Sequence, residues 1–143
     1  MDGKQSRMAD SDRPILLVDD ERRILQAHSS ALRLAGFGAI ETCSDAREVE
    51  SLVAQSPYSV ILLDLAMPHI TGIELLPIIR RHQPDTPVIV ISAFGDVDAV
   101  AGAVKSRVYD FLLKPVDRKQ LVGAVEGALS FGHRAGSDCV VTR

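Results

Sequence analysis

Polar side chains that can do chemistry follow directly after short apolar runs in this chain. In chain order they are Asp19 and Asp20, Asp64, Ser92, and Lys114. Short continuous apolar runs that alternate with helical patterns are typical of buried parallel strands. Because the carboxyl ends of parallel strands meet at one edge of a sheet, we expect three carboxylates, a hydroxyl and an ammonium group to lie together there.

This set of groups suits a divalent cation and a phosphoryl group. Two carboxylates ~4 Å apart repel each other by about 4 kcal/mol at an effective dielectric of about 20, so the cluster needs protonation, a cation or Lys114. Mg²⁺ prefers oxygen ligands and keeps several of its waters, and Mn²⁺ can substitute for it. Asp64 can then act as a nucleophile toward phosphorus, while Lys114 and Ser92 bind the phosphoryl oxygens.

The hydrophobic pattern alternates between strand and helix five times. The expected strands are residues 15–18, 39–43, 60–63, 88–91 and 109–113. Helical spacing of apolar residues predicts helices over residues 21–35, 49–53, 73–81, 97–104 and 121–129. These repeats predict an α/β protein, a flavodoxin-like (βα)5 three-layer sandwich with a five-stranded parallel sheet in the order 2-1-3-4-5. Asp19, Asp20 and Asp64 would meet at its switch point, between the first and third strands.

Short polar signals mark the expected helix ends. Asp45 with Glu48, and Asp117 with Gln120, have the spacing of a capping box. Gly36 is expected to end the first helix, because glycine readily adopts the left-handed conformation found there.

Length and composition predict one globular domain that binds neither nucleic acid nor membrane directly. The 143 residues are 46% hydrophobic and 24% charged, and the formal net charge of −3 offers no basic surface for nucleic acid. No apolar run approaches membrane-spanning length and the first residues are polar, so a cytoplasmic protein is expected. Cys43 and Cys139 match no metal-binding spacing and are expected to be free thiols in a reduced compartment.

Four motifs, in this order along the chain, resemble the receiver domain of bacterial two-component response regulators. They are Ile15–Glu21, Asp64–Pro68 with Gly72, Ser92–Ala93, and Asp110–Pro115. The resemblance covers Pro14 to Phe131, and all four motifs stand at expected strand ends. We therefore expect a receiver domain over residues 14–131, a disordered leader over residues 1–13, and a mobile tail or the start of a linker over residues 132–143.

The resemblance implies a role for each polar residue at the sheet edge. Asp64 would be the phosphoacceptor of a sensor histidine kinase, and Lys114 would contact the phosphoryl group. The metal ligands would be Asp64, Asp20, Asp19 acting through a water molecule, and the backbone carbonyl of Ala66. The protein is thus expected to be no enzyme in the usual sense, but a phosphoacceptor that assists its own phosphorylation and dephosphorylation.

The resemblance also implies a conformational switch. Ser92 would be the switch hydroxyl and Phe111 the switch aromatic, whereas Tyr109 lies two residues too early for that role. The Lys114–Pro115 peptide bond resembles the family's cis peptide. Phosphorylation would change the face formed by the fourth helix, fifth strand and fifth helix. This face would control a partner protein, an output domain in transcription regulation, or a phosphorylation-dependent homodimer.

Other interpretations of these residues stay open. Ser92 can be an ordinary strand-end hydroxyl, Phe111 a core side chain, and His69 a solvated loop residue. An aspartate-nucleophile phosphatase is an alternative for the whole chain, but that chemistry needs a second aspartate where Ala66 stands. A degenerate receiver that acts only as an interaction module is a further alternative, against which the intact acidic set and Lys114 argue.

The chain departs from the family at two places. Arg107-Val108 occupies the corner where receivers usually have Gly-Ala, and arginine is sterically disfavoured in the left-handed conformation expected there. Replacing Arg107 with glycine is therefore expected to raise stability and alter partner binding. Ala66 cannot orient an attacking water and Phe94 can shield an acyl phosphate, so slow hydrolysis of the phosphorylated form is expected.

Overall fold

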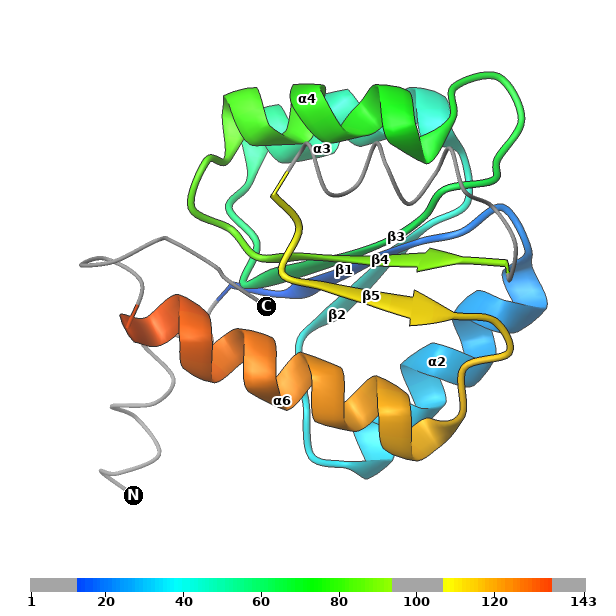
Figure 1. The fold of residues 1–143 in the computed structure, drawn as a ribbon, viewed down its shortest axis with the longest axis vertical. Coiled ribbons are helices and arrows are strands. Elements are labelled where there is room, and N and C mark those ends of the chain that lie inside the picture. Colours follow the sequence, from blue (N-terminus) through cyan, green and yellow to red (C-terminus); the bar gives the residue numbers. More distant parts are fainter. Residues whose placement is uncertain (1–12, 94–106, 135–143) are drawn as a thin grey trace.

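The computed structural model describes residues 13–93 and 107–134, which form three layers (Figure 1). The middle layer is a sheet of five parallel strands in the order β2-β1-β3-β4-β5. The strands are β1 (Ile15–Val18), β2 (Ile40–Cys43), β3 (Val60–Asp64), β4 (Val88–Ser92) and β5 (Asp110–Leu113). This order confirms the flavodoxin-like topology predicted from the sequence.

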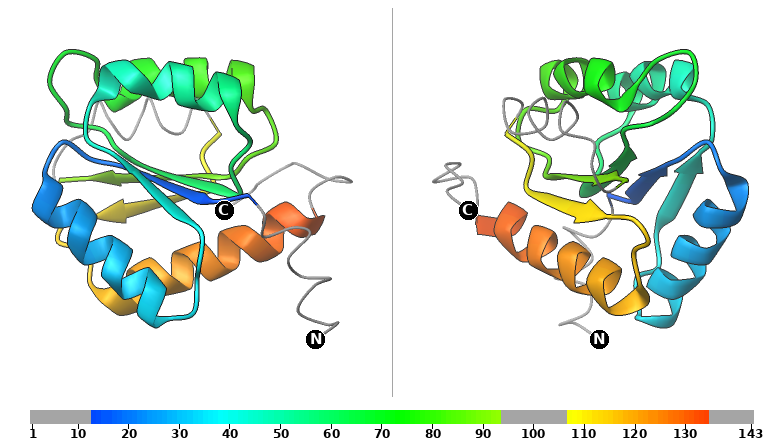
Figure 2. Two further views of the ribbon diagram at one scale, coloured as in Figure 1. Left: turned by 180° about the vertical axis from the view of Figure 1, so that it is seen from behind. Right: turned by 45° about the vertical axis from the view of Figure 1, so that its right-hand side comes forward.

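Helices cover both faces of the sheet (Figures 1 and 2). The described helical elements are α2 (Arg22–Leu34), the 3₁₀ turn η1 (Ala46–Glu48), α3 (Val49–Gln55), α4 (Gly72–His82) and α6 (Arg118–Arg134). α3 and α4 lie side by side on one face, and α2 and α6 cover the other. The helix expected over residues 97–104 lies outside the described residues. None of the described helices has the length and apolar character that crossing a bilayer requires.

The central strands are apolar up to their carboxyl ends because both of their faces are covered. Every residue of β1, β3 and β4 is buried, and alternate side chains of each strand enter opposite layers. Leu16 and Ile61 belong to the core beneath α3 and α4, whereas Leu17 and Leu62 belong to the core against α2 and α6. A continuous apolar run therefore encodes a strand at the centre of the sheet.

The register of the sheet brings the ends of its strands to one level. Val18 of β1 pairs with Leu63 of β3, and Ser92 of β4 pairs with Leu113 of β5. The polar residues that follow these positions are therefore delivered to the same edge.

The capping predictions agree with the structure in part. Asp117 N donates to Gln120 Oε1 at 3.1 Å, and Gln120 N donates to Asp117 Oδ1 at 2.8 Å, which confirms that capping box. The box predicted for Asp45 and Glu48 is wrong. Asp45 instead accepts a hydrogen bond from Arg47 N at 2.9 Å and caps the turn η1, because the chain makes a 3₁₀ turn before α3 begins.

The turn after α2 is open and ends the helix as predicted. Gly36 has a φ of 107°, which favours glycine, and Phe37 N donates to Leu32 O at 3.0 Å to close the helix end. A Cβ at Gly36 or Gly38 would meet no atom within 4 Å. A side chain at either glycine of this turn would therefore have open space around its Cβ.

Candidate functional site

Three carboxylates meet at the carboxyl edge of the sheet. Asp19 and Asp20 follow β1, and Asp64 ends β3; oxygen atoms of all three lie within 4.8 Å of one another. Asp19 and Asp64 are buried, whereas Asp20 is exposed. The structure thus brings together the acidic residues that the sequence analysis singled out, with one side of the cluster open to solvent.

Asp64 is held between a backbone amide and an ammonium group. Its side chain is buried, with 1% of the residue exposed. Asp64 Oδ1 accepts a hydrogen bond from Ala66 N at 3.1 Å, and Oδ2 accepts one from Lys114 Nζ at 3.2 Å. Burial opposes the charge on Lys114, but the carboxylates around it, Asp64 first and then Asp19 and Glu21, together outweigh burial and raise the lysine pKa. Lys114 is therefore a fixed positive charge beside Asp64.

Asp19 is a carboxylate of the cluster whose negative charge is opposed by its surroundings. Burial, aided by the charge of Asp64, raises the pKa of Asp19 to about 6, although the carboxylate accepts a hydrogen bond from Glu21 N at 2.9 Å. The negative charge of this group thus lacks full compensation from the protein's own residues.

The donor set fits a hard divalent cation. The cluster contains only carboxylate oxygens, and the exposed loop residue Ala66 lies two positions after Asp64. Mg²⁺ and Mn²⁺ prefer such oxygen ligands and leave positions for water or phosphate. The acidic cluster is therefore compatible with a divalent metal site.

Gly72 fixes the loop that follows Asp64. Gly72 N donates to Leu65 O at 3.0 Å, and a Cβ on Gly72 would lie 2.6 Å from Leu65 Cα and 2.7 Å from Asp64 O. Only glycine allows this close approach. α4 starts here through a capping box, in which Thr71 Oγ1 accepts from Glu74 N at 3.2 Å and Thr71 N donates to Glu74 Oε1 at 2.9 Å. Sequence reasoning missed this box, although its Thr-x-x-Glu spacing could have identified it.

Ser92 is a buried hydroxyl at the same edge. It ends β4, and its Oγ makes no hydrogen bond to any of the described residues. Its carbonyl accepts a hydrogen bond from Lys114 N at 2.8 Å, which places β4 and β5 in register beside the site. A buried hydroxyl without a partner is unfavourable, so this group is available to an additional acceptor.

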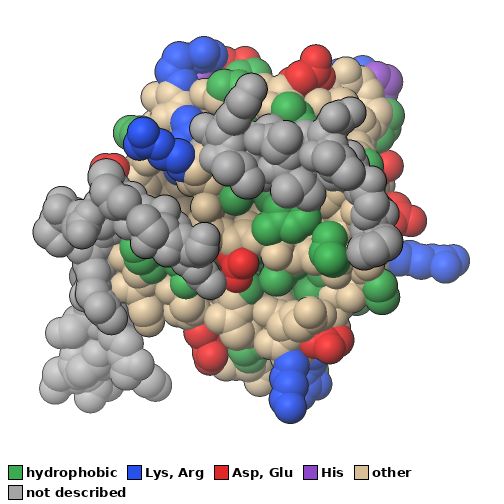
Figure 3. All heavy atoms as spheres, in the orientation of Figure 1, with side chains coloured by type: hydrophobic (Ala, Val, Ile, Leu, Met, Phe, Trp, Pro, Cys, Tyr) green, Lys and Arg blue, Asp and Glu red, His purple; other side chains and the backbone are tan. Residues whose placement is uncertain are grey.

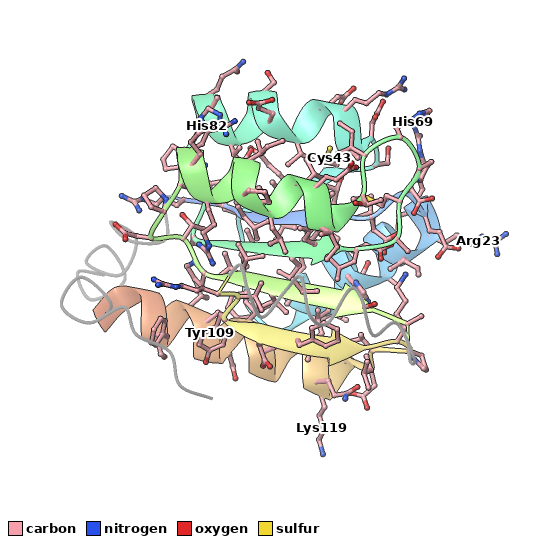
Figure 4. All side chains as sticks on the ribbon, turned by 45° about the horizontal axis from the view of Figure 1, so that its top comes forward. Arg23, Cys43, His69, His82, Tyr109 and Lys119 are labelled. Carbon is pink, nitrogen blue, oxygen red and sulfur yellow. The ribbon has the colours of Figure 1, made fainter. Side chains whose placement is uncertain are left out.

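The two aromatic residues of the β5 segment pack on opposite faces. Phe111 is half-buried against the core beneath α3 and α4. Tyr109 packs on α6, over Gly127 and with its ring 5.3 Å from that of Phe131 (Figure 4). On the face shown in Figure 3, hydrophobic side chains gather over β5, where Leu113 is 42% exposed.

Two backbone features expected from the resemblance are present. The Lys114–Pro115 bond is cis, and Arg107 has a φ of 57°, the left-handed conformation that disfavours arginine. Phe94 lies outside the described residues.

His69 is not one of the carboxylate cluster residues, but it shares a cavity with Asp20. It is exposed on the loop between β3 and α4 (Figure 4), with a φ of 73°. Its side chain lines a polar cavity of about 540 Å³ that also includes Asp20, Arg22 and Arg47. This agrees with the expectation that His69 is a solvated loop residue.

Fold and site together define a flavodoxin-like α/β protein with an acidic centre at its topological switch point. The chain matches the family model of the response regulator receiver domain over residues 15–126. It is 36% identical over 120 residues to the C4-dicarboxylate transport transcriptional regulatory protein DctD of Pseudomonas aeruginosa, covering 84% of this chain and 26% of that protein. It is also 30% identical over 131 residues to the response regulator protein TodT of Pseudomonas putida, covering 92% and 57% of the two chains.

A solved structure shares the fold. The crystal structure of a CheY-like response regulator receiver domain protein from Methanospirillum hungatei superposes with a TM-score of 0.82 at 22% identity, covering 87% of this chain and 98% of that one. The chain therefore belongs to the response regulator receiver domain family. It spans about a quarter of the length of DctD and somewhat more than half of TodT, both of which are named as regulators rather than enzymes.

Proposed function

We propose that this chain accepts a phosphoryl group from a sensor histidine kinase onto Asp64 in a Mg²⁺-dependent reaction. The observation that carries the proposal is the position of the Asp64 carboxylate, which is buried among two other acids and lies 3.2 Å from Lys114 Nζ. Membership of the receiver family supports the same assignment.

In this reaction an Asp64 oxygen attacks phosphorus, the P–N bond of the phosphorylated histidine breaks, and the imidazole leaves with the electron pair. Lys114 binds the phosphoryl oxygens as a point charge. The Ser92 hydroxyl, which makes no other bond among the described residues, donates to a further oxygen. Mg²⁺, when bound, offsets the negative charge on the transferring group. Asp19, Asp20, Asp64 and the carbonyl of Ala66 would hold it.

Phosphorylation changes the conformation of the surface that includes β5 and α6, and this surface contacts the partner or output domain. Phosphorylation adds about −1.5 to −2 charges and three acceptor oxygens. Ser92 and Lys114 would move toward these oxygens, and Phe111, half-buried at the edge of its core, would change its packing. Reversing a 1:99 population of two states requires a difference of roughly 5.5 kcal/mol in phosphate contacts between them.

The chain would act in the cytoplasm through an output domain, a partner protein or a phosphorylation-dependent homodimer. Control of transcription is the output we favour, because DctD is named a transcriptional regulatory protein. A carboxylate two residues after Asp64 would support turnover of a separate substrate, and Ala66 lacks one. We therefore assign storage of the phosphoryl group, with self-assisted phosphorylation and slow dephosphorylation, rather than phosphatase activity.

Intact mass spectrometry tests the proposal. The protein is incubated with acetyl phosphate and Mg²⁺, and the wild type should gain the mass of one phosphoryl group. The gain should be lost with EDTA and in Asp64→Asn, but kept in Glu50→Gln, which alters an exposed carboxylate on α3. An Asp64→Asn protein that is phosphorylated as fast as the wild type would overturn the assignment, and so would a wild type that gains no mass under donor excess.

A further inference from the structure

One arginine of α4 joins the starts of two strands at the edge of the sheet opposite the carboxylates. Arg80 Nη1 donates to Thr86 O at 2.6 Å, and Nη2 donates to Arg107 O at 3.0 Å. Thr86 precedes β4 and Arg107 precedes β5. The guanidinium is half-buried, and burial lowers its pKa. Planar donors in a fixed fork suit Arg80 to bridge two carbonyl groups in this way.

The corner that Arg80 holds is conformationally unusual. Arg107 has a φ of 57°, and such a conformation persists in a residue with a Cβ only where its surroundings determine it. Immediately after the corner, Tyr109 N donates to Val88 O at 2.8 Å and the β4–β5 ladder begins. The hydrogen bond from Arg80 to the Arg107 carbonyl therefore fixes the point from which β5 starts.

α4 and the β5 segment are linked through two sets of contacts, one by way of Asp64 and Leu65 and one by way of the Arg107 carbonyl. Near the site, Gly72 N at the start of α4 donates to Leu65 O at 3.0 Å, directly after Asp64. Lys114, at the far end of β5, lies 3.2 Å from Asp64. At the opposite edge the joint is Arg80. A change at Asp64 thus reaches β5 through Lys114, while the other end of β5 is tied to the helix that packs against Asp64.

We propose that Arg80 is a positioning residue for the switch, because by holding the corner at Arg107 it couples a change at Asp64 to β5. With the start of β5 fixed, a change in the Lys114–Asp64 contact must be taken up within the strand, where Phe111 packs against the core beneath α3 and α4. Without the tie, the corner absorbs the change. The inference rests on the proposed function, since it requires phosphorylation of Asp64.

The test uses the whole 143-residue chain and three variants. Arg80→Met removes the donors but keeps an extended side chain, and Arg80→Lys keeps the charge but cannot bridge both carbonyls. Arg81→Met is the matched control, because Arg81 is the next residue, is exposed, and forms a surface ion pair with Glu50 at 3.5 Å. Beryllofluoride with Mg²⁺ serves as the phosphoryl analogue. The amide chemical shifts of Phe111 and Leu113 report the equilibrium between the two states of β5.

Arg80→Met is expected to take up phosphate from acetyl phosphate at the wild-type rate. With saturating beryllofluoride, however, the equilibrium constant between the two states of β5 should be about five-fold lower than in the wild type, which is the low end of measured coupling between sites. Arg80→Lys should fall between Arg80→Met and the wild type, and Arg81→Met should match the wild type. A lower melting temperature with an unchanged equilibrium constant would show that Arg80 is only structural.

If Arg80→Met does not fold, Arg80→Lys decides the question. A reduced β5 equilibrium constant in Arg80→Lys supports the coupling, and an unchanged one overturns it. A wild type that gains no phosphoryl mass contradicts the proposed function instead, so the two failures are distinguishable.

Discussion

The two edges of the sheet treat buried polar groups in opposite ways. At the edge where the strands start, both polar atoms of the Gln83 side chain are fully bonded. Gln83 Nε2 donates to Val53 O at 2.9 Å and Ser56 O at 2.6 Å. Its Oε1 accepts from Tyr58 N at 3.0 Å and Thr86 Oγ1 at 2.9 Å. This one amide joins α3, the connection between α3 and β3, and the connection between α4 and β4.

At the edge where the strands end, the balance is reversed. Asp19 is buried near the like charge of Asp64, and Ser92 Oγ has no hydrogen-bond partner in the described part of the chain. The first edge satisfies its own polar groups and gains stability, whereas the second keeps groups whose partners must come from outside. Unsatisfied groups of this kind are expected at functional sites.

The largest loss of stability is expected when the hydrogen bonds of Gln83, at the edge where the strands start, are removed. Gln83→Leu leaves two carbonyls and one amide without their Gln83 partner, and it leaves the Thr86 hydroxyl with Tyr58 O at 3.3 Å, so the free energy of unfolding should fall by about 4 kcal/mol. Urea denaturation measures it. Gln55→Leu is the control, because Gln55 is exposed and bonds only Ser51 Oγ, at 2.9 Å; a change within about 0.5 kcal/mol is expected there. Equal losses in the two variants would contradict the role given to Gln83.

Gly72→Ala should strain the functional edge directly. A Cβ 2.6 Å from Leu65 Cα cannot be accommodated without moving the backbone, so we expect a loss of about 3 kcal/mol in unfolding free energy and slower phosphate uptake. The matched change is Gly123→Ala in α6, where a Cβ meets nothing within 4 Å. It should stabilise the protein by roughly 0.8 kcal/mol, the helix preference of alanine over glycine. Similar effects of the two substitutions would refute the crowding at Gly72.

Asp19→Asn should stabilise the protein in the absence of metal, unlike the substitution at Gln83. The substitution removes a buried charge whose pKa is raised to about 6, so in EDTA at neutral pH the free energy of unfolding should rise by about 2 kcal/mol. The same variant should lose the stabilisation that added Mg²⁺ gives the wild type. Thermal denaturation with and without Mg²⁺ measures both quantities. A variant less stable than the wild type in EDTA would be the contrary result.

The charge on Asp19 also predicts a pH dependence of stability. The ordinary pKa of Asp19 is 3.8 and its folded value is about 6, so between these values the folded state binds more protons than the unfolded state. The contribution of Asp19 to stability is then fully present at low pH and is lost as pH rises through about 6. The difference in unfolding free energy between Asp19→Asn and the wild type should therefore grow from pH 4 to pH 7, in EDTA. A difference independent of pH would exclude this cause.

The sequence predicts those features that follow from strand direction and periodicity. Parallel strands with apolar runs before Asp19 and Asp64 place both acids at one edge whatever the details of packing. The Asp117–Gln120 capping box is likewise local, so its spacing was sufficient. Residues that are positioned by the end of their own strand or helix could therefore be identified from the sequence.

Features that depend on contacts between distant segments could not be predicted. Gln83 bonds a carbonyl 30 residues away along the chain, and Arg80 bonds one 27 residues away. No periodicity encodes such pairs, because each requires the finished packing of several loops. The capping box expected at Asp45 failed for a local reason instead, because the chain forms the 3₁₀ turn η1 before α3 begins.

The close approach at Gly72 also decides where the polypeptide tolerates extra residues. An epitope inserted after Gly38 would project from the turn between α2 and β2, where a Cβ at Gly36 or Gly38 meets no atom within 4 Å, and it would leave the hydrogen bond from Phe37 N to Leu32 O in place. The same insertion between Leu65 and Gly72 would lift α4 from the carbonyl of Asp64. Reporter tags that preserve the geometry of the acidic cluster therefore belong at the former turn, and the latter loop has to keep its natural length.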